Sequence, residues 1–581
     1  MFSRYYQSEL SYLKELGEEF AKTNPSLAGL FSTQGGDPDV QRLLEGFAFL
    51  TARIRERVDD AVPEIVEDLT RLLLPQYLQT TPACSVVQFY PQRSAIRGAY
   101  RVEPGTELSA KTVEGELCTF RTTASVDLTS LEIIDVLLDY SIEHTPALRM
   151  RLTVPQSGRD SVLSSHGFRL FFNGPIGVTS QMYLWMNRYL DAVSYIDREN
   201  NEHNLNPDCI RPIGLSESLP MLPWPRSTPG GLRLIQEYFT LPAKLLFLQV
   251  TDLQSVGHDC DEEFEIIFRF NRPPELPEKV TRQMFCLHCV PVVNLFETQA
   301  NPISVDVGMN EYLIRATNID PRHVQVEEVL QVTGESRSSQ SRTEYHSLHS
   351  FEHMDRSDGI DSFYNVRRRP SVHDDGFDIY LSLQTPRDVA PEYRKETLSI
   401  DLTCSNRNLT DKLGIGDISL PTKNSPTVAT FSNITEISKP SFPPVGSNLH
   451  WKMISHLASS TLGFSDHRSI KSILGLYILN NNQETQRERA NRRRVDSIQK
   501  LSKKSVSRLM DKSLIRGLRA TLELDSKSFV SEGDAFVFGC ALHELFVTRT
   551  PINSFHETAI SLIPRDIEFL WSAQAGGHSC L

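Results

Sequence analysis

The run Cys286–Leu287–His288–Cys289 is the part of this sequence whose residue types come nearest to a metal site. Two cysteines at this spacing make half of a zinc site, and a closed zinc site needs four ligands. The sequence has no second CxxC and no histidine pair at finger spacing, and apolar residues 290–296 follow directly. We therefore interpret the cysteines as buried structural thiols and expect no bound metal.

Three histidines, His346, His349 and His353, would share one helix face, with Glu344 and Glu352 nearby. Such a cluster could bind a metal or respond to pH. The surrounding residues are too polar for a stable helix, and the tyrosine before the first histidine favours strands. We interpret the segment as an exposed or half-buried strand and loop.

Motifs of the common enzyme classes are absent from the sequence. It contains no GxGxxG, GxxxxGK[ST], GxSxG or HExxH pattern. His543–Glu544 begins like the last of these but lacks the second histidine. We predict a protein that is not an enzyme and needs no cofactor. An unrecognised hydrolase, with a site assembled from distant residues, stays open as an alternative.

A basic segment, 484–504, concentrates positive charge, mostly within the run QRERANRRRVDSIQKLSKK. A basic patch can contact phosphates, but this one has no interleaved aromatic residues for stacking on bases. We interpret it as a solvated basic surface patch that includes Arg492, Arg493 and Arg494. An acidic protein partner, or nucleic acid bound through 484–504, are the alternatives.

Composition narrows the class of protein. The chain has 581 residues, a net charge of −13, and 39% hydrophobic and 23% charged residues, as in an ordinary globular protein of several folded units. The acidic balance argues against nucleic acid as a partner. We expect no direct membrane insertion, because no run of about eighteen apolar residues occurs. The start lacks a signal region and the nine cysteines are sparse, so we expect a cytoplasmic protein with reduced thiols.

An apolar stripe near the N-terminus must be positioned by a helix. Asp37 suits an N-cap and Pro38 the first helical position. Hydrophobic residues then recur every three or four positions, at Val40, Leu43, Phe47, Leu50, Ile54 and Val58. Such a stripe needs a surface to pack against, which is either the chain's own core or another subunit. We take these six residues as candidate partner-binding residues.

The chain as a whole predicts an α+β multidomain fold. Residues 1–80 read as a helical N-terminal region of assembly helices. Short β-favouring runs separated by Pro, Gly and Ser then predict β-rich domains, followed by a smaller α+β C-terminal part. The expected domains are 1–80; 81–240, ending in a Pro-rich connector; 241–445, with an exposed polar loop at 333–376; and 446–581, with the basic segment 484–504.

Asn294 is the polar member of the apolar run PVVNLFE. If its side chain is buried it must be hydrogen-bonded, because an unpaired buried amide costs roughly 1–3 kcal/mol. We interpret Asn294 as a structural residue that locks a turn.

Several segments resemble one known family in its own order along nearly the whole chain. They are YYQSELSYLKELGEEFAKTNPSLAG, GDPDVQRLLEGFAFLTARIRERVDDAVPEIVEDLTRLLLPQYL, FTLPAKLLFLQV, CVPVVNLFETQANPI, LHWKMISHLASSTLGF and the stretch 514–555. The sequence is similar to the type VI secretion baseplate subunits of the TssF (VasA, ImpG) family. Residues 333–343 and 484–504 match nothing in that pattern.

The resemblance implies a structural role in a cytoplasmic machine. TssF proteins assemble with TssG, two copies to one, into a wedge that also holds TssK and TssE. The baseplate surrounds the spike hub, starts polymerisation of the sheath, and lies at the inner face of the cell envelope beneath the membrane complex. The family is similar to wedge proteins of contractile phage tails, whose helices form a shared bundle. Part of the N-terminal stripe is then expected to contact another subunit.

Overall fold

The structure is a computed structural model, and it divides the chain into two compact units. One consists of Met1–Leu78 with Pro444–Ile454, and the other of Gln79–Pro443 with Ser455–Leu581. The residues that the structure describes are 6–7, 10–13, 16, 39, 42–53, 69–71, 74–92, 95–96, 98–140, 146–155, 167–225, 228, 230–254, 256, 260, 262–273, 279–305, 309, 311–336, 342–348, 362–371, 376–384, 396–443, 466–478, 485–510 and 513–577.

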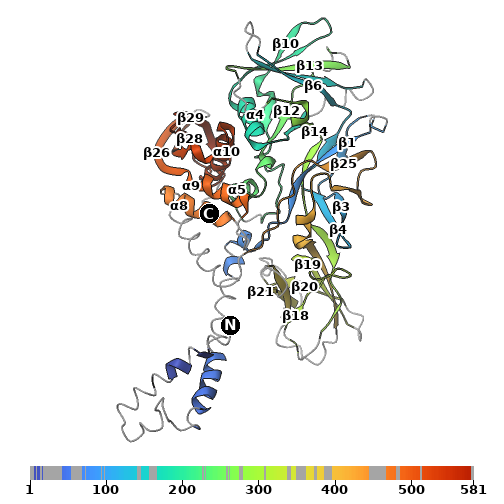
Figure 1. Cartoon of the computed structure of the whole chain (residues 1–581), viewed down its shortest axis with the longest axis vertical. Coiled ribbons are helices and arrows are strands. Elements are labelled where there is room, and N and C mark those ends of the chain that lie inside the picture. Colours follow the sequence, from blue (N-terminus) through green and yellow to red (C-terminus); the bar gives the residue numbers. More distant parts are fainter. Residues whose placement is uncertain are drawn as a thin grey trace. The chain divides into compact units, whose positions relative to one another are not determined.

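Strands dominate the larger unit (Figure 1). The predicted α+β fold class with a helical N-terminal region is therefore wrong: the chain is mainly β. Within 1–80, the described helical residues form only short runs, the longest at 42–53. The error has a physical cause. Several exposed strands carry polar residues on both faces and lack the alternation that marks a half-buried strand, as in β26 (Ile498–Met510), IQKLSKKSVSRLM.

A six-stranded sheet gathers strands from distant parts of the chain. Its order is β24 (Ile418–Pro421), β3 (Glu107–Val113), β4 (Glu116–Thr122), β15 (Cys289–Val293), β1 (Cys84–Pro91) and β25 (Ala429–Asn433). Five of the eight residues of β1 are buried, and β1 pairs antiparallel with both β15 and β25. The six-stranded sheet is therefore completed only by strands that lie far from β1 in the sequence. A separate two-stranded sheet of β2 (Tyr100–Val102) and β5 (Val126–Leu128) comes from the stretch of sequence that also contains β3 and β4.

Two further sheets occupy the part of the chain between β4 and β15. The five-stranded sheet has the order β10 (Glu202–Leu205), β9 (Leu190–Ile196), β13 (Glu263–Phe270), β7 (Ala147–Thr153) and β6 (Glu132–Asp139). The four-stranded sheet has the order β11 (Ile210–Pro212), β12 (Phe247–Val250), β8 (Phe168–Phe172) and β14 (Phe285–Leu287). Helices α4 (Ile176–Arg188) and α5 (Gly230–Thr240) are largely buried.

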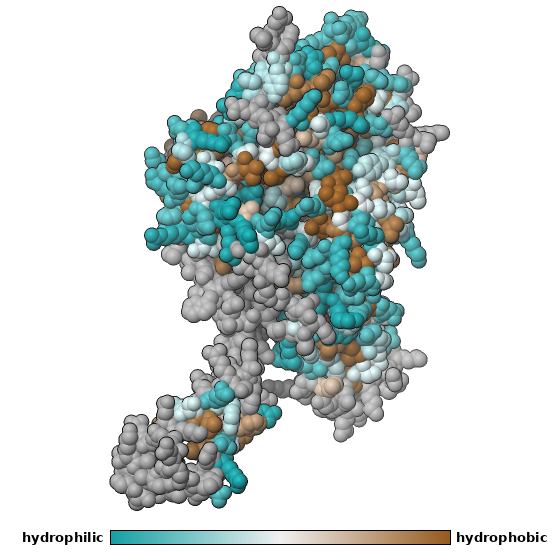
Figure 2. All heavy atoms as spheres, viewed as in Figure 1, coloured by the Kyte–Doolittle hydropathy of each residue, from teal (hydrophilic) through white to brown (hydrophobic). Residues whose placement is uncertain are grey.

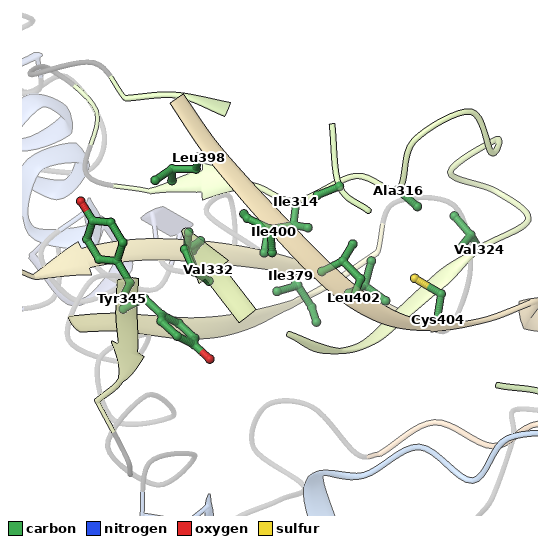
Figure 3. Packing of buried hydrophobic residues seen from close by; sticks show 14 of the residues in the cluster. Ile314, Ala316, Val324, Val332, Tyr345, Ile379, Leu398, Ile400, Leu402 and Cys404 are labelled. Carbon is green, nitrogen blue, oxygen red and sulfur yellow. The ribbon is translucent and has the colours of Figure 1, made fainter. Parts of the chain in front are cut away.

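An eight-stranded sheet has the order β16 (Phe296–Gln299), β23 (Glu396–Ser405), β19 (Gln325–Ser336), β20 (Arg342–Ser347), β21 (Ser362–Pro370), β22 (Phe377–Gln384) and β18 (Tyr312–Leu313), with β17 (Ile303–Ser304) paired to β23. One face holds a core that includes Val332, Ile379 and Leu402 (Figure 3). The described part of 333–376 is thus largely strand, not the exposed polar loop expected. Its strands are polar because their other face is open.

The last part of the chain forms α8 (His467–Tyr477), α9 (Gln486–Asp496) and a sheet in the order β26, β27 (Ser513–Asp525), β28 (Phe555–Ile563) and β29 (Ile567–Ala575). β27 and β28 are parallel, so the chain crosses between them through α10 (Glu532–Thr548). The Ser531 side chain caps α10 by accepting the Asp534 N–H. A Cβ at Gly533 would lie 2.2 Å from the Ser180 backbone of α4, so only glycine permits this close packing.

Short 3₁₀-helices connect the remaining elements. They are η2 (Pro75–Leu78), η4 (Pro207–Cys209), η5 (Pro242–Leu245), η6 (Arg282–Met284), η9 (Arg407–Lys412) and η10 (Ser526–Ser528). Several begin with a proline, which favours the first turn of a helix because its missing N–H would have no partner there.

Candidate assembly surface and buried sites

Three of the predicted partner-binding residues lie on the helical residues 42–53. The side chains of Leu43, Phe47 and Leu50 are 66%, 64% and 59% exposed. Their spacing of four and three residues places them on one face of the helix. The other three predicted residues lie outside the described part of the chain: Val40, Ile54 and Val58.

The same helix also has a buried side, formed by Ala48 and Ala52. Small residues therefore pack inward while large apolar residues remain exposed, and Figure 2 shows hydrophobic atoms on the surface of this part of the chain. Burying each of the exposed side chains would contribute roughly 1.5–3 kcal/mol. An exposed apolar face of this kind is typical of a protein–protein contact.

The basic segment 484–504 is only partly the solvated surface patch that was predicted. Thr485 and Glu488 form a capping box that starts α9. Arg492 and Arg493 are exposed on this helix, but Arg494 is buried. Arg494 therefore does not belong to a solvated surface patch. The sequence carried a signal for this, because the T-x-x-E box and the apolar Val495 mark a helix with one buried side.

Arg494 joins three elements of the C-terminal part. Its guanidinium donates to Asp534 Oδ1 at 2.9 Å and to Asn491 Oδ1 at 3.0 Å. It also lies 5.6 Å from the ring centre of Tyr238 on α5. Burial works to lower the pKa of Arg494, but Tyr238 and Asp534 outweigh it and the pKa is raised. The residue holds α9 against α5 and α10.

The same helix also binds the end of α5 through backbone groups. Arg487 donates to the Thr240 carbonyl at 2.7 Å, and Asn491 donates to the Phe239 carbonyl at 2.9 Å. These carbonyls belong to the last turn of a helix, where no intrahelical partner exists. Part of the basic segment thus satisfies the last carbonyl groups of α5, a role that its charge pattern alone did not indicate.

A buried ion pair of Glu237 and Lys244 follows the Pro-rich connector, and both side chains are fully buried. Glu237 Oε1 accepts the N–H groups of Met221 and Leu222, and Lys244 donates to the Gly214 carbonyl at 2.8 Å. Burial lowers the pKa of Lys244, against the opposing effect of Glu237. The sequence analysis missed this pair, which fixes the connector to α5.

The Cys286–Cys289 run lies where β14 ends and β15 begins, and both cysteines are buried as expected. His288 between them has a φ of 56°, in the left-handed region. Its Nε2 accepts the Thr129 N–H at 3.2 Å and lies 3.0 Å from Thr129 Oγ1. Burial lowers the pKa of His288 to about 4, so the ring is neutral. It serves as a turn residue.

The other predicted histidines fall in different surroundings. His346 lies half-buried on β20, in agreement with a strand, whereas His349 and His353 are outside the described residues. His543 is buried on α10, where Nε2 lies 3.1 Å from Gln574 Oε1 and Nδ1 lies 2.9 Å from Thr558 Oγ1. The Gln574 oxygen can only accept, so Nε2 carries the proton and Thr558 donates to Nδ1.

Asn294 is buried and hydrogen-bonded, which confirms the structural interpretation. Its amide donates to the Thr119 carbonyl at 2.8 Å and to Asn406 Oδ1 at 2.8 Å. Within the part of the chain that the structure describes, no three His, Cys, Asp or Glu side chains are grouped to hold a metal ion. The described helices also include none with the length and apolar content to span a bilayer.

Comparisons with known proteins give one consistent result. The sequence model of the family "Type VI secretion system, TssF" matches residues 1–578. A Pseudomonas aeruginosa protein, type VI secretion system component TssF1, is 25% identical over 621 aligned residues, covering 99% of this chain and 98% of the relative.

Solved structures agree with the sequence comparison. A chain of the TssK-TssF-TssG baseplate subcomplex, solved by cryo-electron microscopy, has a TM-score of 0.79 and 27% identity, covering 92% of this chain and 98% of that chain. A chain of the type VI secretion baseplate complex has a TM-score of 0.63 and 24% identity with full coverage of both chains, which shows the shared fold. The chain is thus of the class of structural components of type VI secretion machines. It belongs to the TssF family.

Proposed function

We propose that this chain is a structural, non-enzymatic subunit of the type VI secretion baseplate wedge that assembles with TssG and TssK. The observation that carries the proposal is the likeness, over 92% of the chain, to a chain of the TssK-TssF-TssG baseplate subcomplex. The role is to hold other subunits in a fixed geometry, which requires permanent interfaces. Such interfaces typically bury more than about 2,000 Å² and resemble a protein core.

The wider assembly follows from the family. Two copies of the chain bind one TssG, TssE joins the same wedge, and the wedges surround the spike hub and start sheath polymerisation. The subunit works in the cytoplasm, at the inner face of the cell envelope, through the baseplate and the membrane complex. The domains proposed for this work remain 1–80, 81–240, 241–445 and 446–581.

The TssG contact is proposed to include the exposed face of the helical residues 42–53. Leu43, Phe47 and Leu50 supply three large apolar side chains on one face, opposite the buried alanines. Val40, Ile54 and Val58, which follow the same spacing in the sequence, are proposed to take part in the same contact. A partner helix that covers the face would remove these side chains from water, and that burial would drive association.

Co-purification with tagged TssG tests this surface. Phe47→Asp and Leu50→Asp are each expected to reduce recovery with TssG to background, because a carboxylate at the centre of an apolar interface must be desolvated. Arg42→Asp is the matched control, since the Arg42 side chain is 81% exposed on the same helix and is not spaced three or four residues from Leu43, Phe47 or Leu50. Its change should leave recovery intact.

Circular dichroism and thermal unfolding establish that the variants fold. If folded Phe47→Asp and Leu50→Asp both retain full recovery, the surface assignment is wrong while family membership stands. The two earlier alternatives gain no support. Arg487 and Arg494 of the basic segment are engaged by protein groups and are not available to nucleic acid phosphates, and no observation favours a hydrolase.

A further inference from the structure

The hairpin of β26 and β27 extends beyond its own sheet. The two strands pair from Ile498 to Met510, but β27 pairs with β28 only from Gly517 onward. The ribbon formed by 507–510 and 513–516 is therefore two strands wide. Near its end Leu509 and Leu514 lie directly opposite each other, and their side chains are 75% and 73% exposed. Exposure of two paired leucines favours a contact with another surface.

This hairpin is basic in an otherwise acidic chain. Residues 498–525, which form this hairpin, contain 7 Lys and Arg against 3 Asp and Glu, whereas the whole chain has a net charge of −13. On the open face of the sheet, Arg508 and Arg519 both donate to the single carboxylate of Glu557. The cluster keeps one net positive charge, and the exposed Lys504 adds to it on the same face. The exposed Arg516 lies on the other face of the ribbon, together with Leu509 and Leu514.

A groove of opposite character lies on the eight-stranded sheet, across strands β16, β23, β19 and β20. Its volume is about 530 Å³, and among the described residues that line it no Lys or Arg occurs. The lining residues are Glu297, Thr298, Gln299, Leu330, Gln331, Glu344 and Asp401. Leu330 is 45% exposed, so the groove also offers an apolar contact. Arg121 partly neutralises Glu297, at 3.9 Å.

We propose that the basic hairpin of one copy of this chain docks in the acidic groove of a second copy. The two surfaces are complementary in charge, and each presents an exposed leucine to the other. They are also different surfaces, so the contact is heterologous and joins copies head to tail. The hairpin–groove contact is distinct from the TssG contact proposed for residues 42–53, and its success or failure is independent of that contact.

Charge exchange in the full-length chain, alone or bound to TssG, tests the proposal by sedimentation velocity. Lys504→Glu with Arg516→Glu reverses two positive charges of the hairpin, and Glu344→Lys with Asp401→Lys reverses two negative charges of the groove. Each pair should weaken self-association roughly tenfold or more, and a chain that carries all four changes should recover it. Raising the salt concentration should weaken the wild-type contact.

The control Lys423→Glu with Lys527→Glu makes the same change in net charge at exposed positions outside both surfaces. It should leave self-association unchanged. The proposal falls if the wild-type chain shows no self-association at low salt and high protein concentration. It also falls if the chain with all four changes fails to recover association. It also falls if hairpin reversal abolishes binding of a DNA duplex, or capture of TssG or TssK, while self-association is unaffected.

Discussion

Asn294 and Asn406 are bonded to each other twice, although 112 residues separate them in sequence. The Asn294 amide donates to Asn406 Oδ1 at 2.8 Å, and the Asn406 backbone N–H donates to Asn294 Oδ1 at 2.7 Å. Asn294 directly follows β15 of the six-stranded sheet, and Asn406 directly follows β23 of the eight-stranded sheet. Backbone groups of Leu117 and Thr119 on β4 complete the network. The pair therefore connects two sheets.

Removal of one member of this pair should destabilise the larger unit. Asn294→Ala leaves the Asn406 N–H and the Thr119 carbonyl without their partner, and each such buried group costs roughly 1–3 kcal/mol. Chemical denaturation should show a loss of this order, whereas Asn424→Ala, at an exposed position, should change little. An Asn294→Ala protein as stable as the wild type would contradict the role given to the pair.

Arg494 and its neighbour Arg493 should differ sharply despite their identical side chains. Arg494→Ala leaves the buried carboxylate of Asp534 without its cation, which typically costs about 3–5 kcal/mol. Arg493→Ala, at an exposed position on the same helix, should stay within about 0.5 kcal/mol of the wild type. Thermal unfolding of the two variants measures the contrast, and equal effects would show that the Arg494–Asp534 pair is not important.

The pair Glu237 and Lys244 should show strong coupling in a double-mutant cycle. Glu237→Gln keeps an acceptor for the Met221 and Leu222 N–H groups but leaves the buried ammonium of Lys244 uncompensated. We expect a loss of about 3–5 kcal/mol for that change, and a clearly smaller loss when Lys244→Met is added. Denaturant titration of the two single variants and the double variant gives the coupling. Simple additivity would contradict a buried charge pair.

His543 should make stability depend on pH in a defined window. Burial lowers its pKa to about 4, from about 6.5 in the unfolded chain. As the pH falls from 6.5 to 4, the unfolded chain therefore binds a proton that the folded protein does not, so the folded state loses stability. His543→Gln removes this contribution. The difference in unfolding free energy between wild type and variant should shift across that window and be constant above pH 7; a difference constant throughout would contradict the assignment.

Sequence patterns predicted buried elements better than exposed ones. The apolar run VPVVNLF gave a correct buried strand and a hydrogen-bonded Asn294, because burial imposes a composition that can be read locally. β21 and β26 were taken for an exposed loop and a solvated surface because an open sheet face accepts almost any polar residue. Their strand character depends on backbone pairing with partners elsewhere in the chain, which a local pattern does not contain.

The candidate sites show the same difference between features that a local pattern indicates and features that depend on distant residues. Exposure of Leu43, Phe47 and Leu50 agrees with the predicted partner-binding stripe, although binding itself stays a prediction. The burial of Arg494 could not be deduced from its charge, because its partner Asp534 lies 40 residues away in the sequence, on α10. Long-range ion pairs of this kind, like Glu237 with the connector, have no signature in a single sequence.

The pairing of β1 with β25 has a consequence for biosynthesis. The partner of Phe89 is Phe431, so one edge of β1 has no native neighbour until the ribosome has translated most of the chain. At about 5–20 residues per second, this interval is roughly 20–70 seconds. A nascent chain whose apolar strand stays unpaired for that long needs chaperones to cover the strand. Slow codons before β25 would lengthen the period in which the open strand edge can aggregate.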